Sequence, residues 1–328
     1  MILVGAEEAP LIPPDADWDA AQAQLLEAGF GDGLPLVLPT EARMVRMLQG
    51  VKDPGQEFGM MPPLFGMLTP EAVAYCCVLA GCVPAELPVV LSAAVASLAD
   101  EFNLLGIQTT TGTPTTAVVV HGPAVQKLGM NSGTNCLGPG NRANACIGRA
   151  LRLVMYAIGG GRPESGDMAT MGQPGKYGFG FAEGAHPLLP SLAVRRGLAE
   201  TDSAVTVLGV SGTIEVLPEA GATSPETVLR PVLAAMHGSR VAGGGGKQRE
   251  GREQILLMPA EMADVFVRHG WDLAAIQDWL QRESGDWPLA RTPQDIVIIP
   301  TGGPGVKMTC LVPWGGGTFS VTRSLIGL

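Results

Sequence analysis

From about residue 200 onward, apolar runs alternate with segments of helical periodicity, and this alternation restricts the fold more than any other feature of the sequence. The runs SAVTVLGV, QILLMP and DIVIIP have the length and the β-branched content of buried strands. SPETVLRPVLAAMHG, between the first two runs, starts with a serine cap and an N1 proline, as helices often do. Strands separated by helices of about ten or more residues favour a mostly parallel sheet, so we expect an α/β fold.

The N-terminal half has a different pattern, which predicts a helical region. The segments PEAVAYCCVLAG and LPVVLSAAVASLADE are apolar on nearly all sides, so both are expected to be buried helices. We expect an N-terminal helical and Gly/Asn-rich lobe at residues 1–200 and a C-terminal βα lobe at residues 201–328, or one integrated unit. Between these helices and the centre of the chain, QTTTGT at 108–113 either lines a polar pocket or forms an exposed edge strand.

The charge of the chain excludes some classes of partner. The formal net charge is −10 and there is no run of Lys or Arg, which argues against nucleic-acid binding. Charged residues make up 16% of the chain, against about 25% in a typical soluble domain. So few charges indicate that much surface is buried between subunits, and we expect a homo-oligomer or an obligate complex.

Targeting and metal-binding signals are missing from the sequence. No stretch approaches about eighteen uninterrupted apolar residues, and the N-terminus lacks a basic segment with a cleavage signature. We therefore expect no membrane span, no signal peptide and a cytoplasmic location. The six cysteines form no CxxC pair and no Cys/His zinc spacing, so reduced thiols and no metal site are expected.

The segment Gly129–Tyr177 carries the strongest functional signal. A loop rich in glycine and asparagine leads into a helix that contains three arginines, and a second Gly-rich loop follows it. A glycine loop at a helix N-terminus presents free N–H groups and the positive end of the helix dipole, which suits an anion. The alternative is a tight turn with an ordinary cap and surface arginines.

The expected ligand of this segment is a carboxylate. Arg142, Cys146 and Arg149 lie at i, i+4 and i+7, on one face of the helix. The two arginines would hold the carboxylate, and nearby amides would orient it or stabilise an oxyanion. The expected substrate-binding residues are Asn131, Asn135, Arg142, Asn144, Arg149, Gly302 and Gly303.

Four residues are expected to be catalytic. Lys176 and Tyr177 follow a polar Gly-rich loop and are acid–base candidates together with Asp167; the alternative is a surface lysine beside a half-buried tyrosine. Cys146 lies between two arginines, whose field would lower a thiol pKa, although a helix this apolar could also simply bury it. His121 at a strand end is a weaker candidate for a base and is more often structural.

The glycine-rich loops do not match nucleotide-binding motifs, so we expect no cofactor. GGGGKQ lacks the P-loop frame, and Gly138-Pro139-Gly140 is not part of a dinucleotide fingerprint. Ligand loops gather at the carboxyl ends of strands, where Gly302–Gly305 lies, as does Gly243–Gly246 with Lys247 if that loop folds over the site. We expect the pocket between the two halves of the chain, with the turn at Gly302 close to the loop before Arg142.

Motifs along nearly the whole chain resemble a bacterial family associated with, or fused to, the UGSC domain, which carries a Sec/Cys-Gly-Ser-Cys motif. This chain lacks that motif and resembles the companion part alone, and it has Pro259-Ala260-Glu261-Met262 where Pro-Glu-His is expected. The matching segments are Asp32 to Pro35 with Pro39-Thr40, Ala80 to Cys82, Arg142 to Ala150, Gly166-Asp167, Gly172 to Pro174 with Lys176-Tyr177, Gly302 to Gly305, and Val321 to Arg323. The resemblance implies an architecture and a motif map rather than a reaction.

These observations favour a cofactor-independent enzyme that acts on a small carboxylate-bearing molecule by lyase- or hydrolase-type chemistry. The alternative function is a non-catalytic or half-site subunit that partners a separate thiol or selenol redox protein. Neither nucleic acid nor membrane is expected as a partner.

Overall fold

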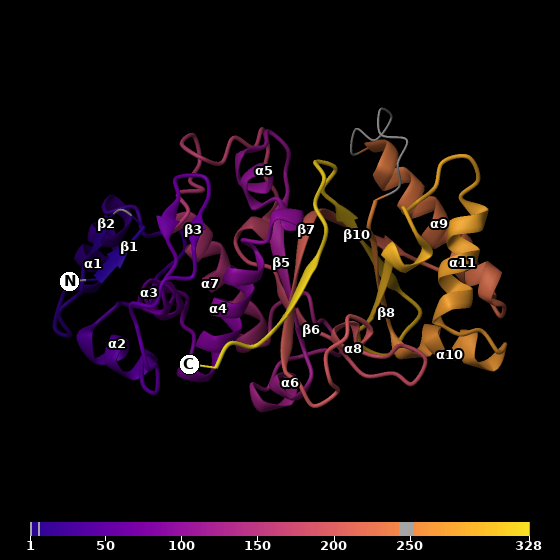
Figure 1. Ribbon diagram of the computed structural model, residues 1–328, viewed down its shortest axis with the longest axis horizontal. Helices are drawn as coiled ribbons and strands as arrows, with labels where there is room; N and C mark the ends of the chain where they lie inside the picture. The colour runs from indigo at the N-terminus through magenta and orange to yellow at the C-terminus, as the bar shows by residue number, and fades with distance from the viewer. Residues whose placement is uncertain (1, 6, 243–251, 328) are drawn as a thin grey trace.

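The computed structural model describes residues 2–5, 7–242 and 252–327, and these form a mixed α/β fold around one seven-stranded sheet (Figure 1). The strand order is β6-β5-β7-β10-β8-β9, and β11 also pairs with β7. The strands are β5 (Thr115–His121), β6 (Gly180–Ala182), β7 (Ala204–Val216), β8 (Gln254–Met258), β9 (Ile296–Pro300), β10 (Met308–Pro313) and β11 (Val321–Ser324). The predicted α/β class is confirmed.

The expectation of a mostly parallel sheet is wrong. Only β5–β6 and β8–β9 pair in parallel, while β5–β7, β7–β10, β7–β11 and β8–β10 are antiparallel. Both parallel pairs are joined through helices, but only β8 and β9 belong to the region where alternation predicted a parallel pair. After β9 the chain returns through a loop at 301–307, which contains no helix, so β10 runs antiparallel to β8.

The sheet curls until its two edge strands approach each other. Beyond β6, the N–H of Gly184 donates to the carbonyl of Pro300 at the end of β9, at 2.6 Å. One buried cluster joins side chains of β5, β7, β8 and β9, including Val119, Leu208 and Ile299. The curl therefore has its own apolar interior and brings the carboxyl ends of β6 and β9 together.

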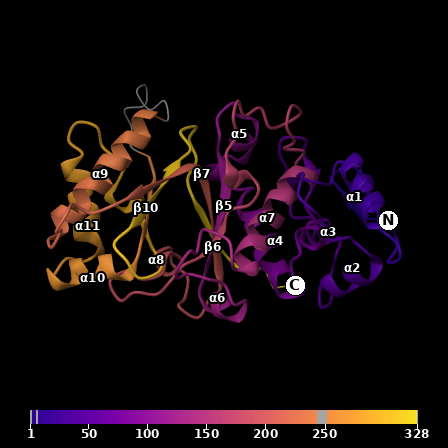
Figure 2. The same cartoon turned by 180° about the vertical axis from the view of Figure 1, so that it is seen from behind.

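Two groups of helices cover the sheet (Figures 1 and 2). The first group is α3 (Pro70–Ala80), α4 (Leu87–Ala96) and α7 (Arg142–Ala157); α4 and α7 pack against β5, β6 and β7, and α3 packs behind them, mainly on α7. The second group is α9 (Pro225–Ala242), α10 (Ala260–Arg268) and α11 (Leu273–Glu283), which covers the part of the sheet formed by β8 to β10. Because β5 and β6 precede residue 200 and β7 follows it, the two expected lobes share one sheet.

The helix α3 forms as its sequence predicts. The hydroxyl of Thr69 caps it by accepting from the N–H of Ala72, and Gly81 ends it in the left-handed conformation, with φ of 84°. All its residues except Glu71 are buried. The remaining elements lie mainly at the N-terminal side: β1 (Ile2–Val4), β2 (Glu7–Ala9), α1 (Trp18–Glu27), α2 (Glu41–Met47), β3 (Met60–Met61), β4 (Gly66–Met67), α5 (Leu104–Thr109), α6 (Pro123–Lys127) and α8 (Leu192–Arg195).

Among the described helices, no single one has the length and apolar character needed to cross a bilayer. The segments Pro84–Ala96 and Asp100–Thr109 meet that test only as a pair bent by 80°. Most of α4 is buried against the rest of the fold. A cytoplasmic location stays a prediction.

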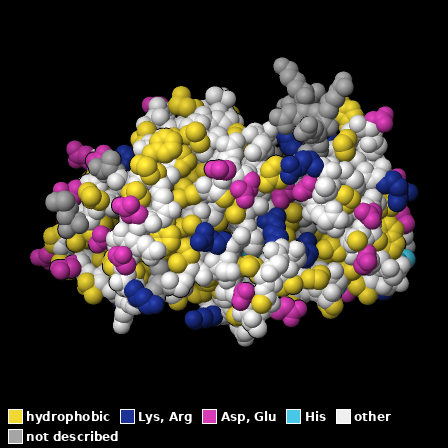
Figure 3. All heavy atoms as spheres, in the orientation of Figure 1, with side chains coloured by type: hydrophobic (Ala, Val, Ile, Leu, Met, Phe, Trp, Pro, Cys, Tyr) yellow, Lys and Arg dark blue, Asp and Glu magenta, His cyan; other side chains and the backbone are white. Residues whose placement is uncertain are grey.

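Large hydrophobic side chains are exposed around α5 and the β3–β4 hairpin. Met60, Leu64, Phe65 and Leu105 are among them. Figure 3 shows hydrophobic side chains gathered over this part of the molecule. Such patches are typical of interaction surfaces, but the homo-oligomer expected from composition stays a prediction.

Candidate functional site

A cavity of about 710 Å³ brings together three of the four residues expected to be catalytic, Asp167, Lys176 and Tyr177. Its lining comes from the turn Gly31–Gly33, from the C-terminal half of α7 and from the loop 163–177. All these residues precede residue 178, so this cavity does not lie between the two halves of the chain as expected. We call it the Asp167 cavity.

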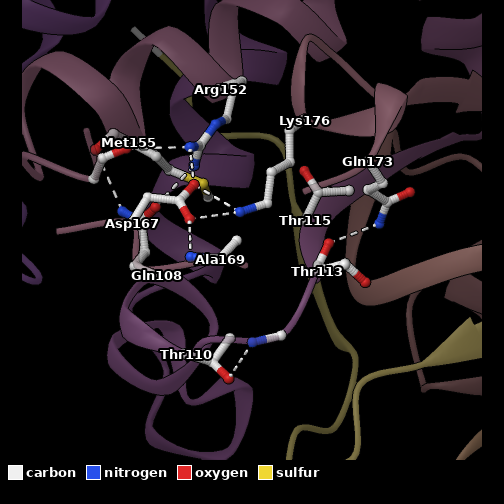
Figure 4. Close-up of polar contacts among 12 residues, drawn as sticks. Gln108, Thr110, Thr113, Thr115, Arg152, Met155, Asp167, Ala169, Gln173 and Lys176 are labelled. Atoms are coloured by element: carbon white, nitrogen blue, oxygen red, sulfur yellow. Dashed lines mark hydrogen bonds and ion pairs between the residues drawn. The ribbon is translucent and has the colours of Figure 1, made fainter. Parts of the chain in front are cut away.

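Asp167 holds two cations at once (Figure 4). The ammonium of Lys176 lies 2.7 Å from Oδ1 and 2.6 Å from Oδ2, and Nη2 of Arg152 donates to Oδ2 at 2.9 Å. The N–H of Ala169 also donates to Oδ1. Two positive groups and one carboxylate leave this cluster with a net charge of +1 when Lys176 is protonated, which favours an anion in the cavity.

Burial shapes the acid–base behaviour of both cations. Burial, helped by the charge of Arg152, lowers the pKa of Lys176 and outweighs the contacts with Asp167, which raise it. Burial likewise lowers the pKa of Arg152, against the opposing effect of Asp167. Because its pKa is lowered, Lys176 gives up its proton more readily than an exposed lysine and can exchange it with a ligand.

Gln108 fixes the orientation of Arg152. Its Oε1 accepts from Nη1 of Arg152 at 2.9 Å, while its amide nitrogen donates to the carbonyls of Pro62 and Met155 (Figure 4). Gln108 is buried near the end of α5, and no strand forms at 108–113, so the edge-strand interpretation of QTTTGT is wrong.

The short turn Pro174–Lys176 is anchored to the sheet. The amide of Gln173 donates to the carbonyls of Thr113 and Val210, and the hydroxyl of Thr115 donates to the carbonyl of Gly175. Figure 4 shows Gln173 and Thr113 beside Lys176. Lys176 therefore projects toward Asp167 from a backbone that β5 and β7 hold in place.

A second ion pair lies next to the cavity. Arg149 donates to Asp32 through Nε and Nη2, both at 2.8 Å, and also to the carbonyls of Leu34 and Pro35. Asp32 lines the cavity, but Arg149 does not. The guanidinium expected to bind substrate is thus already engaged with an internal carboxylate.

Arg142 and Cys146 lie away from the Asp167 cavity. Arg142 donates to both oxygens of the fully buried Glu86, at 2.6 and 3.0 Å. Burial raises the pKa of Cys146, and Cys82 and Glu86 add to this, while Arg142 lowers it less. The expected lowering of the Cys146 pKa is wrong, chiefly because the thiol is partly buried, and Glu86 also opposes the effect of Arg142.

The three expected asparagines hold the loop before α7 together. Asn144 accepts from the N–H of Asn131 and donates to the carbonyls of Asn131 and Cys136. The side-chain oxygen of Asn131 closes a turn by accepting a hydrogen bond from the N–H of Gly133. The side-chain amide of Asn135 donates to the carbonyl of Pro139. None of the three lines the Asp167 cavity.

The expected approach of the Gly302 turn to this loop is confirmed. The N–H of Gly302 donates to the carbonyl of Ser132 at 2.9 Å, and a side chain at Gly303 would collide with Thr134. Ser132 lines a second cavity of about 680 Å³, formed by residues between 122 and 202. Gly302 and Gly303 therefore pack against the loop and lie outside the Asp167 cavity, and Gly243–Gly246 with Lys247 lie outside the described residues.

His121 belongs to a buried polar chain. Its Nδ1 lies 2.6 Å from Oε2 of Glu183 and its Nε2 lies 2.7 Å from the hydroxyl of Thr206, which contacts that of Thr322. Burial alone would raise the pKa of Glu183, but hydrogen bonds, above all that with His121, lower it. His121 is fully buried and links β5 to β7 and to the chain after β6, so the structural interpretation holds.

Sequence reasoning missed Arg152, Tyr156 and Asp32 as parts of the site. Arg149, Arg152 and Tyr156 lie at i, i+3 and i+7, a spacing as regular as the one we used for Arg142, Cys146 and Arg149. The Asp32-Gly33 turn signal gave no hint that its carboxylate would reach α7. Over the described ranges, no group of three or more His, Cys, Asp or Glu residues could hold a metal ion.

In comparisons with family models, curated proteins and solved structures, this chain matched none of them. The resemblance to the UGSC-associated family stays a prediction.

Proposed function

We propose that the protein is an enzyme that binds a carboxylate-bearing molecule in the Asp167 cavity and acts on it without a nucleotide cofactor. The observation that carries this proposal is the spare donor of Lys176. An ammonium has three N–H groups, and Asp167 accepts from Lys176 with its two oxygens. No further acceptor for Lys176 exists within the described chain, so one donor is left at the wall of a cavity with excess positive charge.

The same lysine provides the chemistry. A bound carboxylate accepts the spare N–H, and if negative charge builds up on that oxygen during the reaction, the same proton can pass to it from Lys176. The lowered pKa of Lys176 favours this donation, since the neutral amine that it leaves behind is less costly in a buried position. Tyr177 lines the same cavity and adds a phenol as a second proton donor. This chemistry suits addition–elimination or hydrolysis.

The alternative, a subunit that docks a thiol or selenol redox protein, has less support. The thiols nearest to α7 are poorly suited to exchange. Contact with Cys77, followed by burial, raises the pKa of Cys82, and burial raises the pKa of Cys146, so the reactive thiolates are disfavoured. The Asp167 cavity, with the Lys176–Asp167 pair and Tyr177 in its lining, favours the enzyme instead.

The test is calorimetric titration of small monocarboxylates, from propionate to 3-phenylpropionate, into the protein and into the variants Lys176→Met and Lys127→Met. Lys127 is exposed at the end of α6 and lies outside the cavity, so it controls for loss of one positive charge. A hydrogen bond to a charged group contributes about 1.5–3 kcal/mol, so Lys176→Met is expected to weaken binding by roughly ten- to a hundredfold. Equal affinity in both variants would contradict the proposal.

A further inference from the structure

We infer that the ligand of the Asp167 cavity is a monocarboxylate that carries an aromatic ring, rather than a short aliphatic acid. This inference rests on the proposed carboxylate-binding function and specifies its substrate class. It follows from the charge, the volume and the wall chemistry of the cavity.

The charge of the lining limits the ligand to one anionic group. Arg152 and Lys176 contribute two positive charges, and Asp167 balances one of them. The other carboxylate in the lining, Asp32, is balanced by Arg149. The net charge of +1 matches a single carboxylate, whereas a diphosphate or a tricarboxylate would bring more negative charge than these groups offset.

The volume of the cavity far exceeds that of a carboxylate. A water molecule occupies about 30 Å³ in the liquid, so the head group fills on the order of a tenth of 710 Å³. Cavities of about 300–1,000 Å³ usually take ligands of drug or cofactor size. Most of the Asp167 cavity is therefore left for the body of the ligand.

Part of the cavity lining is apolar and aromatic. Tyr156 projects from α7, Tyr177 comes from the end of the loop, and Met171 comes from its middle. The Arg162 guanidinium lies 5.6 Å from the centre of the Tyr156 ring and does not line the cavity, so it holds this ring in place without filling the space. Two tyrosine rings favour an aromatic partner through offset or edge contacts.

The mouth of the cavity exposes apolar surface that a ligand of this kind would cover. Met171 is 87% exposed and Tyr177 is 54% exposed. Methionine adapts its shape and makes favourable contacts with aromatic rings. A short aliphatic acid has little apolar surface with which to cover these two side chains, whereas an aromatic ring adds the apolar surface needed.

The test compares propionate with 3-phenylpropionate, which share the same head group and differ by the ring. Titration calorimetry is done on the protein and on the variants Met171→Ser and Met168→Ser. Met168 is also exposed and lies in the same loop, but it does not line the cavity, so it is the matched control. We expect 3-phenylpropionate to bind at least tenfold more tightly than propionate, Met171→Ser to reduce that ratio several-fold, and Met168→Ser to leave it unchanged.

The outcomes separate this inference from the proposed function. If both acids bind with equal affinity and Lys176→Met weakens both, the carboxylate site stands and the aromatic class is overturned. If the uncharged 3-phenylpropan-1-ol binds as tightly as 3-phenylpropionate, the carboxylate is not recognised, and the proposed function fails together with this inference. A ratio that falls equally in both serine variants would also overturn the inference, because Met171 would then make no specific contact.

Discussion

The two halves of α7 place their arginines in different electrostatic settings. In the first half, Arg142 and Arg149 each meet one carboxylate through two hydrogen bonds, so their charges are balanced. In the second half, Arg152 shares Asp167 with Lys176, and two cations face a single carboxylate. An arginine on a promising helix face therefore does not mark a site by itself. Charge that remains unbalanced beside a cavity is the better indicator.

Because Arg142 is balanced by Glu86 and lies outside the cavity, we expect its loss to lower stability and to leave ligand affinity unchanged. In Arg142→Met, the fully buried Glu86 loses its only positive partner among the described residues, so the free energy of unfolding should fall by about 3 kcal/mol. This is near the lower end for a broken buried pair because Arg142 itself is half-exposed. Urea denaturation measures the change, which should appear as a lower midpoint at an unchanged slope.

Arg282→Met is the control for that measurement, because Arg282 and Glu283 form an exposed pair on α11. Its loss should cost less than about 1 kcal/mol. The difference between the two halves of α7 is contradicted if Arg142→Met retains full stability and loses affinity for 3-phenylpropionate instead.

The affinity for the ligand should also depend on pH through Lys176, with a smaller expected effect. Burial lowers the pKa of Lys176 below its usual 10.5, so the ammonium that contacts the ligand is lost at lower pH than on an exposed lysine. Affinity for 3-phenylpropionate should therefore be constant below the lowered pKa and fall roughly tenfold as the pH rises through it, since one charged hydrogen bond is lost.

Lys176→Arg separates this titration from other groups, because a guanidinium stays protonated up to about pH 12. The variant should bind more weakly from the start, and its affinity should stay flat up to about pH 10. Titration calorimetry across this range measures both proteins. A wild-type affinity that rises with pH, or a variant that titrates like the wild type, would remove Lys176 from the binding step.

Local signals in the sequence were sufficient to predict much of the fold. Thr69-Pro70 placed the start of α3, and the apolar character of α3 and α4 indicated their burial. The tendency of ligand loops to gather at the carboxyl ends of strands correctly predicted that Gly302 lies close to the loop before α7. The direction of β10 could not be predicted, because strand and helix alternation says nothing about which edge a returning strand joins.

The candidate site could be predicted only where its members are close in sequence. Asp167, Lys176 and Tyr177 lie in one loop, and they do line one cavity. The partners of the arginines come from far away: Arg149 and Asp32 are 117 positions apart, and Arg142 and Glu86 are 56 apart. No periodic pattern encodes such pairs, so the balanced arginines looked as available to a ligand as Arg152.

We propose that a carboxylate binds at Lys176 rather than at Arg142 or Arg149. The most direct measurement is a crystal structure of the protein with 3-(4-bromophenyl)propionate, in which the anomalous signal of bromine locates the ring. We expect the bromine near Met171 and Tyr177 and the carboxylate within hydrogen-bond distance of Nζ of Lys176. A ligand found instead beside Arg142, with the Asp167 cavity unchanged, would contradict this proposal.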